Sequence, residues 1–173
     1  HYIPNGIVKG DWDKHVDMPQ EHSDVLGDLK NKHKFIVGYF GGHALSNALY
    51  ILLEVAENID IAEIHFVLVG DGVEKKNLQR LAQEKSLDNI TFMPSVPKLS
   101  VPKLLENFDC IYIGGESHSL YRFGVGLNKL YDSMMAGKPI IYALNSANDD
   151  VADYKCGISI KSEDVEEIIV AIT

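Results

Sequence analysis

The sequence of 173 residues has few of the features that mark secreted or membrane-spanning proteins. Its only two cysteines, Cys110 and Cys156, form neither a C-x-x-C pair nor a disulfide framework, which favours a reducing compartment. No apolar run approaches the roughly 20 residues that cross a bilayer, and the first residues contain no apolar stretch of a signal peptide. We therefore expect a cytoplasmic protein, and we expect any association of the intact parent with the inner membrane face to be peripheral.

Positive charge is also scarce. The chain has 16 Lys and Arg residues against 25 Asp and Glu residues, so its formal net charge is -9 at pH 7. A field of this sign repels nucleic acid and anionic lipid, so we predict no nucleic-acid partner. A ligand that carries phosphate would need a local positive pocket on this acidic protein.

The sequence lacks the short motifs of the common nucleotide and metal sites. The first unit contains no G-x-G-x-x-G string and no Walker A string occurs, so NAD and P-loop interpretations lose their main support. None of the seven histidines falls into an H-x-x-x-H pair or a cluster with cysteine. We predict no metal site and no cofactor.

The chain does contain a regular alternation of apolar runs and amphipathic stretches, which is typical of successive βα units. Its 46% hydrophobic and 24% charged residues are ordinary for a globular domain with one core. The apolar runs predict strands at residues 35–40, 64–69, 89–93, 109–113, 139–143 and 157–160. The amphipathic stretches predict helices at residues 45–56, 73–86, 98–107, 127–136 and 163–172.

This alternation predicts an α/β, Rossmann-like three-layer domain with a parallel sheet of about six strands. The domain is expected over residues 35–173, after an interdomain hinge and lead-in segment at residues 1–34. Polar and glycine-rich loops follow the predicted strands, with the sequences GGHALSN, GDG, PSVPK, GGESHSLYRFGVG and NSANDD. Because the carboxyl ends of such strands meet at one rim, where ligands bind, we expect the functional site there.

The longest of these loops enters the helix predicted at residues 127–136. Its apolar side chains are predicted to face the core: Leu127, Leu130, Met134 and Met135. Three polar side chains are predicted to share an exposed turn: Asn128, Lys129 and Asp132. Lys129 opposes the helix macrodipole, a penalty of about 0.3–1 kcal/mol that a bound anion would reverse. Gly124 and Gly126 leave room for a ligand beside the main chain. Lys129 is thus a candidate phosphate ligand, and Asp132 a candidate acceptor from ribose hydroxyls.

Simpler interpretations exist for the same residues. Lys129 and Asp132 could form an ordinary surface pair three residues apart. His43, in the first glycine turn, could contact a phosphate or sugar, but a loop histidine is more often only solvated. The polar residues after the fifth predicted strand are expected to cap the following helix: Asn145, Ser146, Asn148 and Asp149.

Six strings occur in order along the chain. They are YIPNG (2–6), FGG (40–42), FVLVGDG (66–72), NITFMPSVPK (89–98), FDCIYI (108–113) and NKLYDSMMAGKPII (128–141). Their order and spacing resemble the retaining glycosyltransferases of glycosyltransferase family 4, which have the two-Rossmann-domain architecture called GT-B. The string FGVGLNKLYDSMMAGKP most resembles the bacterial branch that makes cell-surface polysaccharides such as lipopolysaccharide or capsule.

The resemblance implies that the chain is the C-terminal, donor-binding half of a hexosyltransferase whose N-terminal acceptor domain is absent from it. Such a half binds a nucleotide diphosphate sugar, here expected to be a UDP-sugar. The parent would transfer the sugar to a glycan or lipid-linked acceptor held by the missing domain. Since donor and acceptor meet in a closed interdomain cleft, the fragment alone should bind donor but transfer little.

Roles carry over by position. Lys129 would meet the donor diphosphate as a catalytic residue, with Arg122 as a weaker candidate for the same role, and Asp132 would bind the ribose. The resemblance assigns the remaining donor contacts to three groups: Gly41, Gly42 and His43 near the diphosphate, Ser95 and Val96 beside the base, and Gly124, Val125, Gly126, Leu127 and Asn128 around the sugar.

Two departures from the family pattern keep other functions open. The first acid of the family's acid pair falls on Gly124, and Asn47 stands where a lysine is often found after the first strand. A GT-B sugar-nucleotide epimerase would also use Asp132 and a nucleotide, with its acid and base groups in the absent half. A catalytically degenerate module would bind only a nucleotide or a protein partner.

Overall fold

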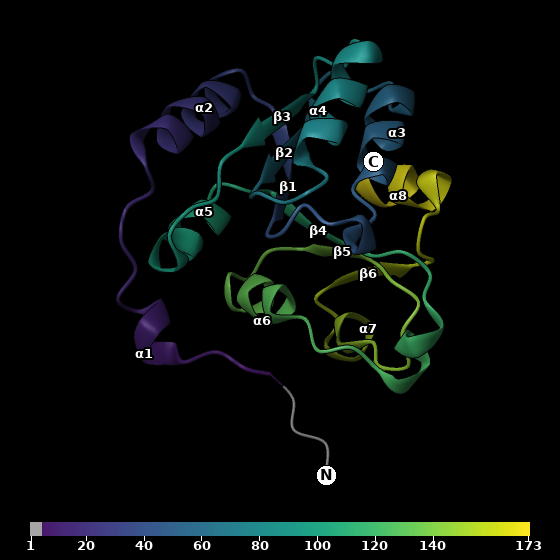
Figure 1. Cartoon of the computed structure of the whole chain (residues 1–173). Helices are drawn as coiled ribbons and strands as arrows, with labels where there is room; N and C mark the ends of the chain where they lie inside the picture. The colour runs from purple at the N-terminus through teal and green to yellow at the C-terminus, as the bar shows by residue number, and fades with distance from the viewer. Residues whose placement is uncertain (1–4) are drawn as a thin grey trace.

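A six-stranded parallel sheet forms the centre of the molecule (Figure 1). The computed structural model describes residues 5–173, apart from the side chain of Asp11, so residues 2–4 of the predicted hinge string lie outside the described residues. The strand order is β3-β2-β1-β4-β5-β6. The strands are β1 Phe35–Phe40, β2 Ile64–Val69, β3 Ile90–Met93, β4 Cys110–Gly114, β5 Ile140–Ala143 and β6 Gly157–Ile160. These bounds lie within one residue of those predicted, and the α/β Rossmann-like fold is confirmed.

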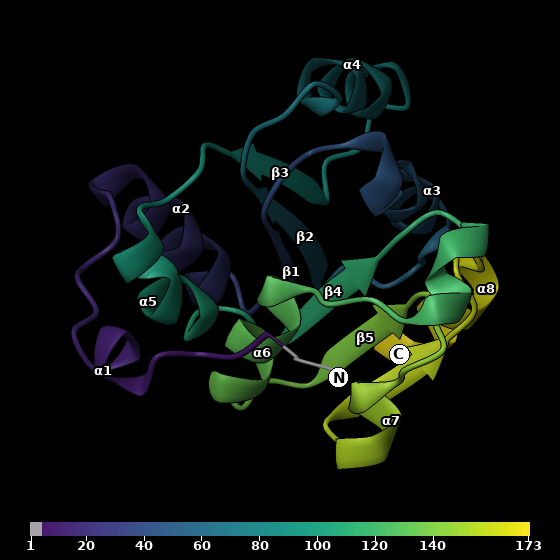
Figure 2. The same cartoon turned by 60° about the horizontal axis from the view of Figure 1, so that its bottom comes forward.

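Helices cover both faces of the sheet (Figure 2). One layer contains α3 (Tyr50–Asn58), α4 (Lys75–Glu84) and α8 (Val165–Ile172). The other contains α2 (Gln20–Asn31), α5 (Val101–Leu105), α6 (Asn128–Met135) and α7 (Asp150–Tyr154). A short helix, α1 (Lys9–Trp12), precedes α2, and turns of 3-10 helix lie in three loops: η1 (Leu45–Asn47), η2 (Lys98–Ser100) and η3 (Ser119–Phe123).

The central strands are buried almost throughout because helices lie on both faces. All residues of β2 are buried, and in β1 only Phe35 is exposed. Side chains alternate between the two cores: Tyr39 and Phe66 pack in the core under α3, whereas Ile36 and Val67 pack in the core under α2. This arrangement accounts for the nearly unbroken apolar runs FIVGYF and IHFVLV.

The helix predicted at residues 45–56 begins later than expected. Residues 45–47 form the turn η1, Ala48 takes a left-handed φ of 48°, and α3 begins at Tyr50. The side-chain amide of Asn47 donates to the carbonyl oxygen of Gly42 at 2.9 Å, which closes the loop before the helix starts. Leu45, expected on the buried stripe, is therefore exposed.

The segment predicted as a lead-in contains a packed helix, α2. Leu26 and Leu29 of this helix are buried in the same core as β1 and α5. A ring nitrogen of His22 lies 2.9 Å from the carbonyl oxygen of Pro94, at the end of β3. The residues of α2 thus pack as part of the domain.

Both cysteines are free thiols. Cys110 lies in β4, where burial raises the pKa of its thiol to about 12, so it stays protonated and unreactive at neutral pH. Within residues 5–173, no helix is both long and apolar enough to cross a membrane.

Strands β1 and β4 meet where the strand order reverses direction. Asp109 fastens them: its carboxylate accepts from the backbone N–H of Ile36 at 2.8 Å, and its own N–H donates to the Ile36 carbonyl at 2.9 Å. The ring of Phe108 lies so close to Gly38 that a Cβ there would come within 2.1 Å of it. Close packing therefore requires the glycine in FIVGYF.

The substitution Gly38→Ala is expected to lower the free energy of unfolding by about 1–3 kcal/mol, because the Phe108 ring must move. Urea denaturation measures the change. The matched control is Gly27→Ala in α2, where no atom lies within 4 Å of the new Cβ. That change should leave stability equal or raise it by up to about 1 kcal/mol, since Ala is the better helix former. Equal stability of Gly38→Ala and the wild type would contradict the packing described.

Candidate functional site

The loops that follow β1 and β4 meet at the carboxyl ends of the strands. The sheet reverses its order between these two strands, which is where a doubly wound fold leaves a crevice for ligands. The backbone N–H of Glu116, after β4, donates to the carbonyl oxygen of Ser46, after β1, at 3.2 Å. The first turn of α6 lies at the same rim, so three predicted site segments come together there.

Lys129, in the first turn of α6, extends over β1. Its ammonium donates to the Tyr39 hydroxyl at 3.1 Å and to the side-chain oxygen of Asn47 at 2.9 Å. The nitrogen also lies 4.5 Å from the centroid of the Tyr39 ring. The ammonium nitrogen lies 3.9 Å from the position that a Cβ on Gly41 would occupy. Lys129 and Gly41, which were both predicted to lie near the diphosphate, are therefore adjacent.

The charge of Lys129 has no acidic partner among the described residues. None of the ion pairs found in residues 5–173 includes it. Burial alone lowers the pKa of its ammonium to about 8. The alternative that Lys129 and Asp132 form an ordinary surface pair is wrong, because each side chain is partly buried and they point into different surroundings. Met135, predicted to face the core, is exposed because α6 ends there.

The carbonyl oxygen of Gly42 accepts two side-chain hydrogen bonds, from the Tyr39 hydroxyl at 2.6 Å and from the Asn47 amide at 2.9 Å. The two side chains that hold the Lys129 ammonium therefore also hold the glycine turn after β1. Sequence reasoning placed Tyr39 only within a strand. The available signal was its phenol, since a buried tyrosine hydroxyl usually finds a polar partner.

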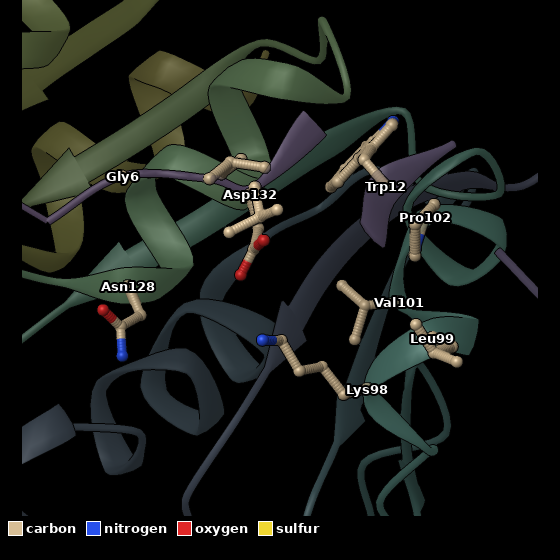
Figure 3. A pocket seen from close by; sticks show the side chains of 10 residues that line it. Gly6, Trp12, Lys98, Leu99, Val101, Pro102, Asn128 and Asp132 are labelled. Atoms are coloured by element: carbon tan, nitrogen blue, oxygen red, sulfur yellow. The ribbon is translucent and has the colours of Figure 1, made fainter. Parts of the chain in front are cut away.

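A cavity of about 200 Å³ lies beside Asp132 (Figure 3). Asp132 and Asn128, both predicted donor contacts, line one side, and Lys98 points its ammonium into the space. Burial raises the pKa of Asp132 above its usual value, and the charge of the nearby Lys98 offsets only part of this rise. The other lining residues are Gly6, Ile7, Val8, Trp12, Leu99, Val101 and Pro102, which sequence reasoning did not assign to the site.

A second cavity, of about 310 Å³, lies over the ends of β1, β2 and β3. Four predicted donor contacts line it: Gly41, Gly42, Ser95 and Val96. Val101 lines both this cavity and the cavity beside Asp132, so the two cavities adjoin. A Cβ on Gly70 would come within 1.8 Å of the carbonyl oxygen of Gly41. The close contact of these two loops therefore depends on glycine.

An ion pair holds the loops of this second cavity in place. The ammonium of Lys75 lies 3.0 Å from Asp71 and also donates to the carbonyl oxygens of Gly70 at 2.7 Å and Met93 at 2.9 Å. Asp71 accepts from the backbone N–H of Ser95 at 3.1 Å. The hydrogen bonds from Lys75 and Ser95 hold the pKa of Asp71 near 2, so the carboxylate stays charged.

Residues 27–173 match the family described as glycosyl transferases group 1. The chain belongs to this family. Over 83 residues, 48% of this chain and 20% of the relative, it is 31% identical to WcaI of Escherichia coli (strain K12), a protein to which glycosyl transfer in colanic acid biosynthesis is ascribed.

Two solved structures resemble this group 1 domain. The match to HepE of Anabaena, in complex with UDP and glucose, has a TM-score of 0.71 at 19% identity and covers 97% of this chain and 45% of HepE. The match to WaaG, a glycosyltransferase involved in lipopolysaccharide biosynthesis, has a TM-score of 0.68 at 14% identity and covers 98% of this chain and 45% of WaaG. The chain thus spans less than half the length of these relatives, and at such identities the likeness shows the fold.

In this glycosyl transferases group 1 domain, the loop before α6 is held by Asn148. The Asn148 side-chain oxygen accepts from the backbone N–H of Val125 at 2.8 Å, and its amide donates to the Val125 carbonyl at 3.0 Å. Asn148 was predicted to cap a helix, which is wrong because both its polar atoms bind Val125. The neighbouring prediction is confirmed, since Asp149 accepts from the N–H of Ala152 in α7 at 3.0 Å. Within the predicted sugar cradle at residues 124–128, the main chain of Val125 is therefore held by Asn148.

Several predicted site residues line neither cavity, among them Lys129, Arg122 and His43. Arg122 lies in η3 with its guanidinium carbon 4.7 Å from the centroid of the Phe123 ring. His43 is fully buried between Tyr39 and Phe92, and burial together with the charge of Lys75 lowers its pKa to about 4, so its ring is neutral at pH 7. Across the described part of the chain, no group of three His, Cys, Asp or Glu side chains is placed to hold a metal ion.

The substitution Asn148→Asp is expected to lower the free energy of unfolding by about 1–3 kcal/mol. A carboxylate can still accept from the Val125 N–H, but it faces the Val125 carbonyl without a hydrogen to donate. Urea or thermal denaturation measures the effect. The matched control is Asn145→Asp, whose partner Ser162 can turn its hydroxyl to donate to the new carboxylate. If both substitutions lowered the free energy of unfolding equally, the result would contradict the importance of the hydrogen bond from Asn148 to the Val125 carbonyl.

Proposed function

We propose that this chain is the donor-binding domain of a retaining glycosyltransferase that uses a UDP-sugar. The observation that carries the proposal is the partly buried ammonium of Lys129, which has only neutral partners and lies beside a glycine turn at the rim of the sheet. Enclosing a cation without a counter-ion is costly, and a bound anion offsets that cost. A donor diphosphate supplies such an anion.

Two further features favour a diphosphate next to Lys129. No described side chain caps the N-terminus of α6, so the backbone N–H groups of Asn128 and Lys129 are available to an anion. Gly41 and Gly42 line the adjoining cavity and allow close approach to the main chain. In transfer, charge develops on the leaving diphosphate, and a fixed ammonium and helix N-terminus stabilise it electrostatically. We propose that Lys129 does this without a metal ion.

Asp132 supports the assignment of a nucleotide to the cavity in Figure 3. Its carboxylate points into the cavity, where it can accept hydrogen bonds from ribose hydroxyls. The bound UDP of HepE, whose fold is similar, supports uracil as the base. The roles of WcaI in colanic acid and WaaG in lipopolysaccharide synthesis support a parent enzyme that acts in surface polysaccharide synthesis. We propose that this parent is cytoplasmic, peripheral at the membrane, and transfers the sugar to a glycan or lipid-linked acceptor.

Calorimetric titration with UDP tests the donor site. Lys129→Ala and Asp132→Asn should each weaken UDP binding by about 1–3 kcal/mol, because each removes a charge-assisted contact. Matched controls are Lys103→Ala and Asp153→Asn, which change a partly exposed and an exposed charge that line neither cavity and should leave affinity unchanged. UDP binding that survives both site variants unchanged would contradict the proposal, as would the absence of binding by UDP, GDP and ADP alike.

The affinity for UDP should depend on pH through Lys129. Burial lowers the pKa of this group to about 8 in the free protein, so the ammonium is present at pH 7 and is lost as pH rises through 8. Because the diphosphate binds the charged form, affinity should fall by up to about tenfold per pH unit above that point. In Lys129→Arg the charge persists, so affinity should stay level over the same range. The same slope in both proteins would show that another group titrates.

A further inference from the structure

The cavity in Figure 3 has a wall that none of the predicted donor contacts supplies. Gly6, Ile7, Val8 and Trp12 form this wall. They belong to residues 5–17, the part of the predicted lead-in that comes before α2. From here on, only these residues are called the lead-in segment. Asp132 and Asn128 face it from α6. The cavity therefore lies between the lead-in segment and the helix that carries Lys129.

The lead-in segment is fastened at both ends to loops of the site. At its start, the side-chain amide of Asn5 donates to the carbonyl oxygen of Gly126, just before α6, at 2.9 Å. At its end, the hydroxyl of Ser100 in η2 donates to the carbonyl oxygen of Asp17 at 2.9 Å. Since Gly126 precedes α6 and Ser100 follows Leu99, and both α6 and Leu99 line the cavity, the residues between these two anchors are held beside it as a wall.

Trp12 is the only tryptophan of the chain and the one aromatic side chain among the residues that line this cavity. Figure 3 shows its indole at the edge of the cavity, between Asp132 and Pro102, and across the space from Lys98. The cavity thus combines a flat apolar surface with a carboxylate and an ammonium. A nucleoside fits the first two of these features, since its base has two apolar faces and its ribose hydroxyls donate hydrogen bonds to a carboxylate.

We infer that Trp12 stacks on the nucleobase of the donor, which makes the lead-in segment part of the donor site. The inference rests on the proposed function, in which Asp132 holds the ribose to which this base is attached. Stacking is tolerant of base identity because every base has a π-face. Trp12 therefore contributes affinity for the nucleoside without choosing among bases, and it contributes nothing to a ligand that lacks a base.

Titrations with UDP and with inorganic pyrophosphate, in metal-free buffer, test the inference. Trp12→Ala should weaken UDP binding about 5- to 100-fold, the range found for removal of one base-stacking side chain. Pyrophosphate, which has no base, should bind the variant within about twofold of its wild-type affinity. Trp12→Phe, which keeps an aromatic face, should recover most of the UDP affinity. UDP should also change the fluorescence of Trp12, and pyrophosphate should not.

The outcomes separate this inference from the proposed function. Equal weakening of UDP and pyrophosphate in Trp12→Ala would show that the indole only holds the lead-in segment in place, and would overturn the inference. Unchanged UDP affinity in that variant would overturn it too, while leaving the donor site intact. Absence of UDP binding by the wild type would overturn both. Tyr154→Ala, which removes an exposed aromatic ring from α7 outside both cavities, is the control and should bind UDP as the wild type does.

Discussion

The placement of one lysine ammonium determines how the rim of this domain is built. Lys129 reaches from α6 over β1, and its contacts are the hydroxyl and ring of Tyr39 and the amide oxygen of Asn47. These two side chains also hold the carbonyl of Gly42. The cation and the glycine turn are thus fixed by the same groups. An anion that binds Lys129 would therefore also lie next to the open main chain of that turn. The contacts of one ammonium thus position both the lysine and the glycine turn of the candidate site.

A second lysine at the rim shows what a satisfied cation looks like. Lys75 has the carboxylate of Asp71 at 3.0 Å and two carbonyl oxygens at 2.7 and 2.9 Å, so its charge is compensated within the protein. It ties the ends of β2 and β3 together and has no need of a ligand. Lys129, with neutral partners only, retains an uncompensated charge. The contrast between these two partly buried lysines supports a structural role for Lys75 and the proposed anion-binding role for Lys129.

The sequence was sufficient to predict the sheet and to single out part of the candidate site, and the reasons are physical. The strands were predicted because parallel strands covered on both faces are continuous apolar runs. Lys129 and Asp132 were singled out from the start of a helix, and the glycine turn after β1 from the resemblance to a family. The contributions of Tyr39 and Trp12 could not be predicted in this way. Tyr39 reads as a strand residue and Trp12 as part of a connecting segment, and only tertiary contacts bring them to Lys129 and Asp132. His43 shows the opposite error, since its turn is at the site but its ring packs into the core.

The glycine that replaces the first acid of the family pattern is explained by the loop around it. Gly124 has a φ of 93°, a conformation that side chains rarely adopt, and a Cβ there would lie 3.0 Å from the side-chain oxygen of Asn148. Asn148 uses that oxygen to hold the N–H of Val125. An acid at position 124 would strain the backbone and crowd this contact. The loop therefore contains a paired contact between the Val125 main chain and the Asn148 side chain where the family pattern has a carboxylate.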